Sequence, residues 1–531
     1  MPRLSAQGAR ATPCWGCPEG WFTGGGSGFT AGGNRLGGKT VRPVFRFLSD
    51  GLVHEIRDEA LRVLEKVGVL VDHEEARALL LDAGCRQNTQ TGRITIPASL
   101  VERALSSAPS TIELFDRQGK LVVRLGRDPS VFNPGSAALT VLDWNTQHQR
   151  KAETQDVIAV ARLTESLEYL ALQSTAVIPS DVPPGIADRY RLGVALIFGS
   201  KPVVTGTFRE DGFDPMRQML LALRGSEEEL RRKPLAILDC CPSPPLKWSH
   251  LTCQALLDCA RAGIPAELVS MPLCGATAPV TLVGSLVQHT AETLSGIVIH
   301  QLASPGAPII YGGSPAATDL RTGTTPMGAI ETMMMDAAYN EIGRSFGLPT
   351  HAYMGLTDAK LLDAQAGAEA ALGAVLAALS GVSVVSGPGM MDFESCFSLE
   401  KLVIDNEFCG MALRAARGIE KRDEELAADL YGDLTRGDLF LTSDVTLRWF
   451  REELFFPSPV IDRDGYERWA QKGRSSAAER AHARVQQLLN APPNPAQPAQ
   501  VEQILSVLRE ENRRAGGGVL PLERVVREMQ G

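Results

Sequence analysis

The stretch LPTHAYMGLTDAKLLDAQAGAE, Leu348–Glu369, indicates how this chain folds. A short extended run from Pro349 to Met354 carries a histidine and a tyrosine and ends at Gly355. Polar residues follow, and the Ala-rich sequence predicts a helix from about Asp363. A short strand that ends in a glycine and a polar cluster, just before a helix, is typical of the repeating unit of an α/β barrel.

The same unit recurs through the central part of the chain. Each short β-branched run is followed by small or polar residues, a loop and an amphipathic helix. The eight runs are 131–136, 169–179, 202–208, 235–244, 266–275, 308–315, 350–355 and 382–389. The helices predicted between them are 154–167, 186–198, 215–225, 248–262, 282–303, 329–346 and 363–379. Near-continuous apolar strands are expected in a parallel sheet that is covered on both faces.

We therefore predict an α/β fold, a TIM (β/α)8 barrel at 126–419, because eight such units in about 260 residues match that architecture. A doubly wound sheet is the alternative, but no GxGxxG follows the first run. Residues 43–125 are predicted to form an N-terminal helical region packed on the barrel, with short strands near Ile94 and Ile112. Residues 420–531 are predicted to form a helical C-terminal extension.

The first 42 residues differ from the rest. They are rich in glycine and poor in aliphatic residues, so they are predicted to be a disordered tail. Cys14 and Cys17 form a CxxC, but a single pair is weak evidence for zinc. The other cysteines lie in apolar segments, as reduced core cysteines do, and a cytoplasmic protein fits best.

Charge and hydropathy argue against two classes of partner. The net charge of -9 and the absence of long runs of like charge argue against a nucleic-acid surface. No apolar stretch reaches the roughly 18 residues that a membrane span requires.

In a barrel, the functional residues lie at the C-terminal ends of the strands. Most of the residues there are small, neutral hydrogen-bonding groups, which suit a neutral or cationic ligand better than a phosphate. They are Asn133, Ser136, Thr175, Thr205, Thr207, Cys241, Ser243, Met271, Tyr311, Ser314, His351, Tyr353 and Ser386.

A metal site is one alternative. Barrel hydrolases hold metals with histidines and carboxylates at several strand ends, but here only His351 qualifies. Cys240, Cys241 and Cys274 are near strand ends, yet adjacent cysteines point to opposite faces of a strand. No protein-bound metal is therefore expected.

Several polar residues are equally consistent with structural roles. His351 and Tyr353 share a strand face by alternation, which favours a place in a pocket. Asp319 and Arg321 would also form a loop ion pair, and Glu331 would also be a first-turn acid favoured by the helix dipole.

Several motifs together resemble the trimethylamine:corrinoid methyltransferase family. They occur in the family's order from about Phe47 to near the C-terminus. They are KPLAILDCCPSPPL (233–246), LSGIVIHQL (294–302), DLRTGTTPMGAIE (319–331), TDAKLLDAQAGAE (357–369) and FSLEKLVIDNE (397–407).

The resemblance implies a TIM barrel that passes a methyl group from a methylamine to Co(I) of a cobalamin, carried by a separate corrinoid protein. Trimethylamine-specific members have pyrrolysine in the strand-seven loop, where this chain has Leu356 in GLTDAK. Leucine cannot form the amine adduct attributed to pyrrolysine. The expected substrate is therefore a quaternary amine such as glycine betaine, proline betaine or carnitine, whose nitrogen is already an activated leaving group.

The expected binding residues follow from this chemistry, since a quaternary ammonium needs aromatic faces or carboxylates and a dry site. Tyr353 and Tyr311 would form walls, and Glu331 or Asp358 would give negative potential. Arg321 or His351 would meet the substrate carboxylate, Leu356 would be an apolar wall, and Asn133 would line the pocket. No residue is assigned as catalytic. The loop 389–397 would form part of the mouth that receives the corrinoid protein.

Two other functions stay open at the level of sequence. One is a barrel that binds a quaternary amine without turnover, and the other is a metal-dependent hydrolase or lyase. The resemblance also implies a homo-oligomer.

Overall fold

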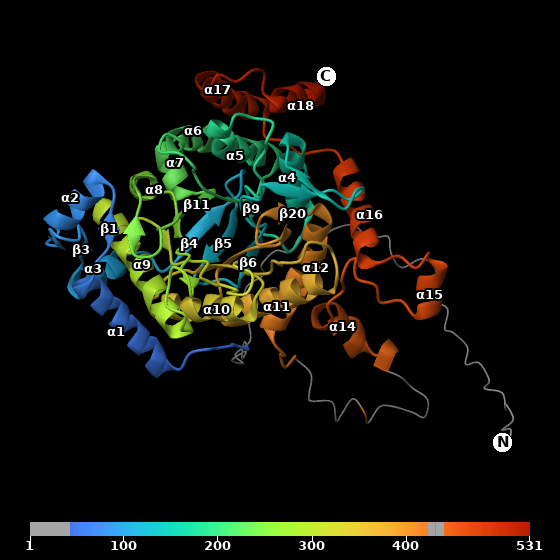
Figure 1. The fold of residues 1–531 in the computed structure, drawn as a ribbon. Helices are drawn as coiled ribbons and strands as arrows, with labels where there is room; N and C mark the ends of the chain where they lie inside the picture. The colour runs from blue at the N-terminus through green and yellow to red at the C-terminus, as the bar shows by residue number, and fades with distance from the viewer. Residues whose placement is uncertain (1–42, 423–430, 432–439, 531) are drawn as a thin grey trace.

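The computed structural model describes residues 43–422, 431 and 440–530. The predicted tail, with Cys14 and Cys17, lies outside the described residues. Eight parallel strands occupy the centre of the molecule, and helices surround them (Figure 1). The strands are β6 (Val131–Asn133), β9 (Gln173–Ser174), β10 (Val203–Thr205), β11 (Ala236–Cys240), β13 (Ala266–Leu268), β15 (Ile309–Ile310), β17 (His351–Tyr353) and β18 (Val384–Ser386).

These strands form two sheets that meet at two isolated parallel bridges. One sheet has the order β15-β13-β11-β10-β9, and the other has the order β17-β18-β6. The bridge Phe132↔Leu170 joins β6 to the residues before β9, and Tyr311↔Thr350 joins the end of β15 to the start of β17. All eight predicted runs are thus strands, and they pair in parallel in the order of the chain.

The helices between the strands lie close to their predicted positions. They are α4 (Thr154–Ser166), α5 (Ala187–Phe198), α6 (Phe213–Arg224), α7 (Glu227–Arg232), α8 (His250–Ala262), α9 (Leu282–Ala303), α10 (Ile330–Ser345), α11 (Ala364–Ser380) and α12 (Leu399–Arg417). Local chemistry sets their ends: Asp363 accepts hydrogen bonds from the first backbone N–H groups of α11, and Gly381 ends that helix at φ 73°.

The N-terminal region contains more β structure than the sequence predicts. Its elements are α1 (Asp50–Lys66), β1 (Leu70–Val71), α2 (Glu74–Asp82), β2 (Arg86–Gln87), β3 (Ile94–Thr95), α3 (Ala98–Ser107), β4 (Ile112–Phe115) and β5 (Leu121–Leu125). β4 and β5 form an antiparallel hairpin. Its apolar residues share one buried cluster with side chains from β10, β11, β15 and β18, so the hairpin packs against the central strands.

A second layer of short strands follows the C-terminal ends of the central strands. β7 (Thr140–Leu142), β8 (Gln149–Lys151), β19 (Met390–Met391) and β20 (Cys396–Phe397) make one small sheet. β14 (Leu273–Cys274) pairs with β16 (Ala316–Ala317), and β12 (Lys247–Trp248) pairs with β1. The loops that carry these strands therefore support one another at that end of the molecule.

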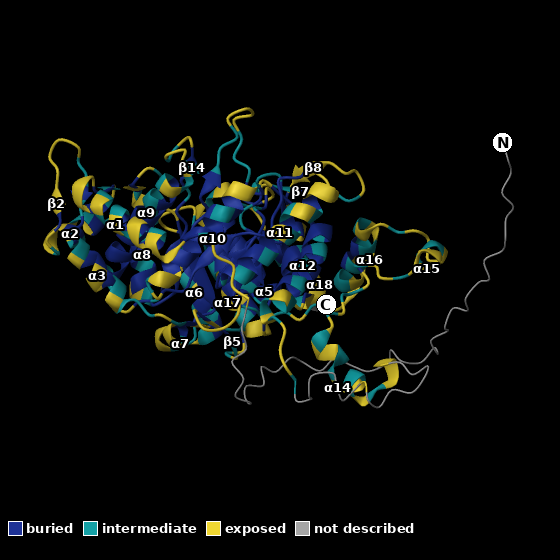
Figure 2. Cartoon of the chain, turned by 90° about the horizontal axis from the view of Figure 1, so that it is seen from below, coloured by how far each residue is buried: buried dark blue, intermediate teal, exposed yellow. Residues whose placement is uncertain are grey.

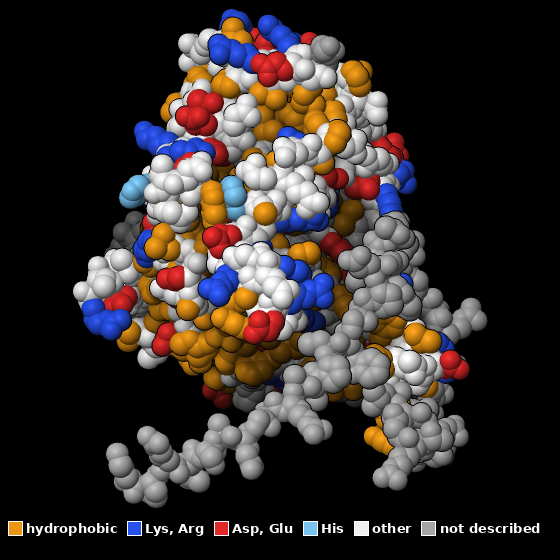
Figure 3. All heavy atoms as spheres, turned by 90° about the vertical axis from the view of Figure 1, so that its right-hand side faces the viewer, with side chains coloured by type: hydrophobic (Ala, Val, Ile, Leu, Met, Phe, Trp, Pro, Cys, Tyr) orange, Lys and Arg blue, Asp and Glu red, His pale blue; other side chains and the backbone are white. Residues whose placement is uncertain are grey.

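The C-terminal region contributes helices on the outside of the molecule (Figure 1). They are α14 (Asp444–Glu453), α15 (Tyr466–Gln471), α16 (Ala477–Asn490), α17 (Pro498–Arg514) and α18 (Pro521–Gln530). α16 contacts α12 and α4, and α17 contacts α5 and α6. Burial is concentrated in the centre, whereas α14 and α15 are largely exposed (Figure 2). The face on the right of Figure 1 carries apolar side chains among charged ones (Figure 3).

Helices capable of crossing a membrane are absent from the described ranges.

Candidate active site

Acidic residues on two neighbouring strands face each other in the candidate site. Asp239 of β11 is the register partner of Glu267 of β13, and parallel partners present their side chains to the same face. On the second sheet, Tyr353 of β17 is the partner of Ser386 of β18, which is in turn the partner of Asn133 of β6. The register therefore gathers polar side chains from five strands.

His351 lies between these two groups and is fully buried. Its Nε2 is 3.0 Å from Ser386 Oγ, which is 2.9 Å from Asn133 Nδ2. Its Nδ1 is 3.0 Å from Glu267 Oε1, but this contact lacks the alignment of a hydrogen bond. Burial lowers the pKa of His351 to about 4, so the imidazole is neutral at neutral pH.

Asp239 and Glu267 are coupled carboxyl groups. Burial raises the pKa of Glu267 to about 8. Burial, together with the neighbouring Glu267, raises the pKa of Asp239 well above its usual range. Because two buried like charges repel, the pair retains at least one proton at neutral pH. Asp239 Oδ2 accepts a hydrogen bond from Tyr353 OH at 3.4 Å. Asp239 and Glu267 share a side-chain hydrogen bond when one of them is protonated, and no other described residue bonds to Asp239 Oδ1 or to the Glu267 oxygens.

Glu394 reaches the site from a loop with an unusual backbone. Asp392, Phe393 and Glu394 have φ values of 49°, 56° and 62°, which non-glycine residues rarely adopt. Lys360 supports this turn, because its Nζ lies 3.3 Å from Asp392 Oδ1 and 4.0 Å from the centroid of the Phe393 ring. Glu394 Oε1 is buried without a hydrogen-bond partner in the described structure. Burial, followed by the charges of Asp239 and Asp358, raises the pKa of Glu394 to about 8.

Asp336 of α10 completes a group of four carboxyl residues, Asp239, Glu267, Asp336 and Glu394, which we call the acidic cluster. Burial and the charge of Glu394 raise the pKa of Asp336 well above its usual range, and neither of its carboxyl oxygens is bonded to a described residue. Unbonded buried acceptors are rare in proteins, and each calls for an explanation. Six carboxyl oxygens of the acidic cluster have no described hydrogen-bond partner outside the cluster, and they are suited to a ligand that offers positive charge.

The structure brings four of the predicted site residues together. All four are buried: Asn133 ends β6, His351 begins β17, Tyr353 ends it, and Leu356 lies in the loop that follows. The rings of His351 and Tyr353 meet edge to face, with centroids 4.8 Å apart. Leu356 is buried beside Gly387 and adds an apolar surface.

Two other predicted residues have structural contacts instead. Tyr311 points to the opposite face of its strand, where it packs with Thr350 against Gly343 of α10 and its OH donates to Thr290 Oγ1 at 3.1 Å. Asp358 accepts hydrogen bonds from Met327 N and Gly328 N, both at 2.9 Å, so it holds a loop. Burial raises the pKa of Asp358 to about 6.

The remaining two predicted residues face solvent. The Arg321 side chain is 88% exposed and forms an ion pair with Asp319 at 2.7 Å. Glu331 is exposed in the first turn of α10. Both therefore correspond to the structural roles that the sequence left open.

Asp239, Glu267, Asp336 and Glu394 were missed by the sequence analysis, which expected mainly neutral strand ends. That expectation was wrong for β11 and β13. The signal was present in both strands, because an acid inside an otherwise apolar run is expensive to bury without a purpose.

No group of three or more His, Cys, Asp or Glu side chains suited to a metal ion occurs in the part of the chain that the structure describes. Cys240 is buried, and its Sγ–H points to Leu238 O at 3.9 Å, whereas Cys241 is exposed. Cys274 is buried, with Sγ 2.9 Å from Val280 O. The three cysteines thus have no common metal centre.

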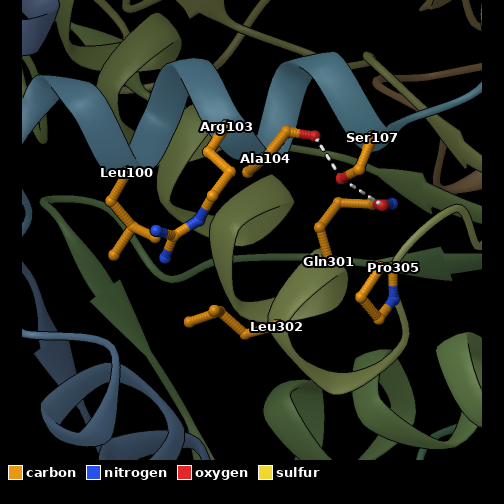
Figure 4. A pocket seen from close by; sticks show the side chains of 7 residues that line it. All are labelled: Leu100, Arg103, Ala104, Ser107, Gln301, Leu302 and Pro305. Carbon is orange, nitrogen blue, oxygen red and sulfur yellow. Dashed lines mark hydrogen bonds between the residues drawn. The ribbon is translucent and has the colours of Figure 1, made fainter.

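A cavity of about 220 Å³ lies away from this site, between α3 and the end of α9 (Figure 4). Ser107 Oγ lies 2.9 Å from both Ala104 O and Gln301 Oε1, which share its single hydroxyl proton. Gln301 Nε2 donates to Ala307 O, just before β15 begins. The Ser107 and Gln301 side chains of the cavity are thus bonded to each other and to nearby backbone, at the opposite, N-terminal end of the strands.

Comparison with known proteins identifies the family. Residues 37–516 match the family described as trimethylamine methyltransferase (MTTB). The chain belongs to this family. Trimethylamine methyltransferase MttB of Desulfitobacterium hafniense is 32% identical over 464 residues, which cover 87% of this chain and 93% of that protein.

Two further relatives of the trimethylamine methyltransferase family extend the comparison. Trimethylamine methyltransferase MttB of Methanosarcina thermophila is 34% identical over 442 residues, covering 81% of this chain and 89% of that protein. Glycine betaine methyltransferase of Desulfitobacterium hafniense is 29% identical over 449 residues, covering 84% of this chain and 93% of that protein. The predicted family is therefore confirmed, and the chain is a methyltransferase.

Among solved structures, the monomethylamine methyltransferase MtmB of Methanosarcina barkeri is similar to this chain at 11% identity. Its TM-score is 0.44, and the match covers 88% of this chain and 93% of that one. The hydroxylamine complex of MtmB gives a TM-score of 0.49 at 11% identity, with 90% of each chain covered.

Proposed function

We propose that this methyltransferase transfers a methyl group from a quaternary amine to Co(I) of a cobalamin that a separate corrinoid protein carries. The acidic cluster beside Tyr353 is the observation that supports this best. A quaternary ammonium has no N–H to donate, so it is held by diffuse negative charge and aromatic faces. Carboxyl groups with free oxygens next to a tyrosine provide both.

The residues around the cluster suit a substrate that needs only placement. Leu356 offers no reactive group, and His351 is neutral at neutral pH. When the N–CH3 bond of a quaternary ammonium breaks, the leaving group is a neutral tertiary amine. It departs without taking up a proton, so no general acid is required at the nitrogen. The tasks of this chain are to bind the cation, exclude water and aim one methyl group toward the mouth of the site.

The nucleophile would come from outside this chain. Co(I) of the bound corrinoid would attack the methyl carbon. Support for a docking face comes from the loops that follow β6, β10, β14, β16 and β17. Each exposes a large apolar side chain: Leu139, Phe208, Val280, Leu320 and Leu361, exposed by between 42% and 73%. Exposed apolar groups on several loops that follow the strands are typical of a protein contact surface.

The architecture proposed for this site is a closed (β/α)8 barrel. The bridges Phe132↔Leu170 and Tyr311↔Thr350 lie where a single ring of eight strands would need them. The domain limits 43–125, 126–419 and 420–531 belong to the same proposal, and the exposed Leu447, Leu454 and Phe456 support the predicted homo-oligomer. The cytoplasmic location stays a prediction.

Methylation of added cob(I)alamin tests the function. Absorbance is followed with glycine betaine, proline betaine, carnitine, choline and trimethylamine as donors. At least one quaternary amine should methylate cob(I)alamin, and trimethylamine should not. Glu267→Gln should lower kcat/KM at least tenfold, because it removes a carboxyl group that ionises when the cation binds. A charge about 4 Å away is worth about 4 kcal/mol in a partly shielded site, and the ionisation offsets part of this. Glu467→Gln, an equal change on exposed α15, should have no effect.

Other outcomes identify the alternatives. Betaines that raise the melting temperature while cob(I)alamin stays unmethylated would indicate a binding protein without turnover. Stoichiometric zinc in the purified protein would favour a metal-dependent hydrolase or lyase.

A further inference from the structure

Arg191 is a buried cation that its neighbours leave largely unbonded. It lies in the middle of α5, and only 1% of its surface is exposed. Its Nη1 donates to Thr175 O at 2.8 Å, and its Nε is buried with no hydrogen-bond partner. That is one hydrogen bond from a group with five N–H donors, counted over the described residues.

Among the residues that the structure describes, no carboxylate accepts a hydrogen bond from this guanidinium. Asp188, three residues earlier on α5, instead accepts from the backbone N of Arg189, from Thr207 Oγ1 and from Phe208 N. Burial lowers the pKa of Arg191 to about 10, so it is charged at neutral pH. A buried charge with unused donors costs free energy unless an acceptor reaches it.

Arg191 lies next to the acidic cluster on one side and next to a partly exposed loop residue on the other. Its charge acts on Asp239 and on Tyr353, whose OH donates to Asp239. On its other side the guanidinium lies over the Phe208 ring, 4.6 Å from the centroid, and Phe208 is 42% exposed. The guanidinium therefore stands between the proposed cation site and a loop at the mouth.

Three other arginines do not have this combination. Arg189 is also buried, but it pairs with Asp188, Asp211 and Glu511. Arg209 pairs with Asp211 and is half exposed, and Arg321 pairs with Asp319 in solvent. Of these four, Arg191 alone combines burial with donors that no carboxylate occupies.

We propose that Arg191, and not Arg321 or His351, binds the carboxylate of a betaine whose quaternary ammonium lies against the acidic cluster. The cationic half of this assignment rests on the function proposed above. The ammonium lies against the acidic cluster, and the carboxylate takes the free donors of Arg191, including Nε. A planar guanidinium is well suited to this task, because it meets both oxygens of a carboxylate.

The test compares three ligands that separate the two charges. Glycine betaine carries both, choline carries only the ammonium, and tert-butylacetate carries only the carboxylate. Dissociation constants are measured by calorimetry for the wild type and for Arg191→Met, Arg191→Lys, Arg321→Met and Arg209→Met. The melting temperature of each variant shows whether it is folded.

Arg191→Met should weaken glycine betaine and tert-butylacetate by about 10- to 100-fold, as expected for a charge-assisted pair, and change choline by less than threefold. Arg191→Lys should retain part of the preference for ligands with a carboxylate over choline, and Arg209→Met should retain all of it. If Arg191→Met does not fold, the wild-type preference for glycine betaine over choline and the Lys variant carry the test.

Different outcomes overturn different statements. A wild type that binds choline as well as glycine betaine, or a carboxylate preference lost in Arg321→Met instead, overturns the role of Arg191. Glycine betaine that binds through Arg191 yet never methylates cob(I)alamin supports the carboxylate site and overturns the methyltransfer.

Discussion

At the scale of single residues, carboxyl groups of the site are protonated where a cation is expected to bind. The pKa values of Glu267 and Glu394 are about 8 in the ligand-free protein, so both groups are mostly protonated at neutral pH. A bound cation favours the ionised carboxylates and lowers these pKa values. Binding should therefore release protons to the solvent.

This coupling predicts how affinity depends on pH. The association constant for glycine betaine should rise from pH 6 to pH 8 by up to about tenfold per pH unit for each proton released, and level off above pH 8. Calorimetry in two buffers of different ionisation enthalpy counts the protons. Glu267→Gln should remove one of them. A flat profile would show that the carboxyl groups are not in contact with the ligand.

Residue-scale chemistry was also the hardest part to predict from sequence. The alternation of side chains correctly placed His351 and Tyr353 on one face of β17. By the same alternation Thr350 points to the other face, and Tyr311, which pairs with Thr350, points there too. Asp239 and Glu267 lie within apolar runs and could have been found. The contribution of Glu394 could not, because it depends on three consecutive residues in a left-handed backbone.

At the scale of elements, one glycine lets α11 approach the loop that carries Leu356. A Cβ on Gly373 would lie 2.7 Å from the backbone N of Gly355, whose own φ is 78°. A Cβ on Gly367, earlier in the same helix, would meet nothing within 4 Å. Gly367 therefore serves as a control for Gly373, because both lie in the same helix and only Gly373 is crowded.

Alanine substitutions at these two positions should have opposite effects. Gly367→Ala should stabilise the protein by up to about 1 kcal/mol, the difference in helix propensity. Gly373→Ala should destabilise it by about 1–3 kcal/mol, because backbone must move. Urea unfolding gives both values. Gly373→Ala should also weaken glycine betaine binding, since Leu356 would shift with Gly355. Equal effects at the two positions would contradict this packing.

Elements were predictable because hydrophobic periodicity and turn residues specify them locally. The eight central runs and the helices between them lie near their predicted positions. The β4–β5 hairpin was incomplete in the prediction, because only the segment near Ile112 read as a strand. Its pairing and its packing against β10, β11, β15 and β18 are tertiary contacts, which cannot be predicted from a local sequence pattern.

At the scale of the whole molecule, Arg117 connects the C-terminal extension to the central unit. Only 8% exposed, it donates through Nη1 to Leu196 O, Ile197 O and Gly199 O at the end of α5. Its Nη2 donates to Asn494 O and Pro495 O. One side chain thus bonds five carbonyl groups and places a cation at a helix C-terminus.

Loss of this connection should loosen the extension before the site. Arg117→Met should lower the free energy of unfolding by about 3 kcal/mol, because buried carbonyl groups lose a charged donor. Proteolysis should become faster between α16 and α17, while glycine betaine affinity changes less than twofold. Arg127→Met, on an exposed neighbouring turn, is the control. Unchanged proteolysis would show that the helices hold the extension without Arg117.

The pairing of β6 with β18 has a consequence for synthesis of the chain. Asn133 and Ser386, which hydrogen-bond across these strands, are 253 residues apart. At roughly 5–20 residues per second, a ribosome needs roughly 10 to 50 s to pass from one to the other. During that time one edge of the first central strand has no neighbour. An open strand edge is a template for aggregation, so the nascent chain should depend on chaperones until its last strand emerges.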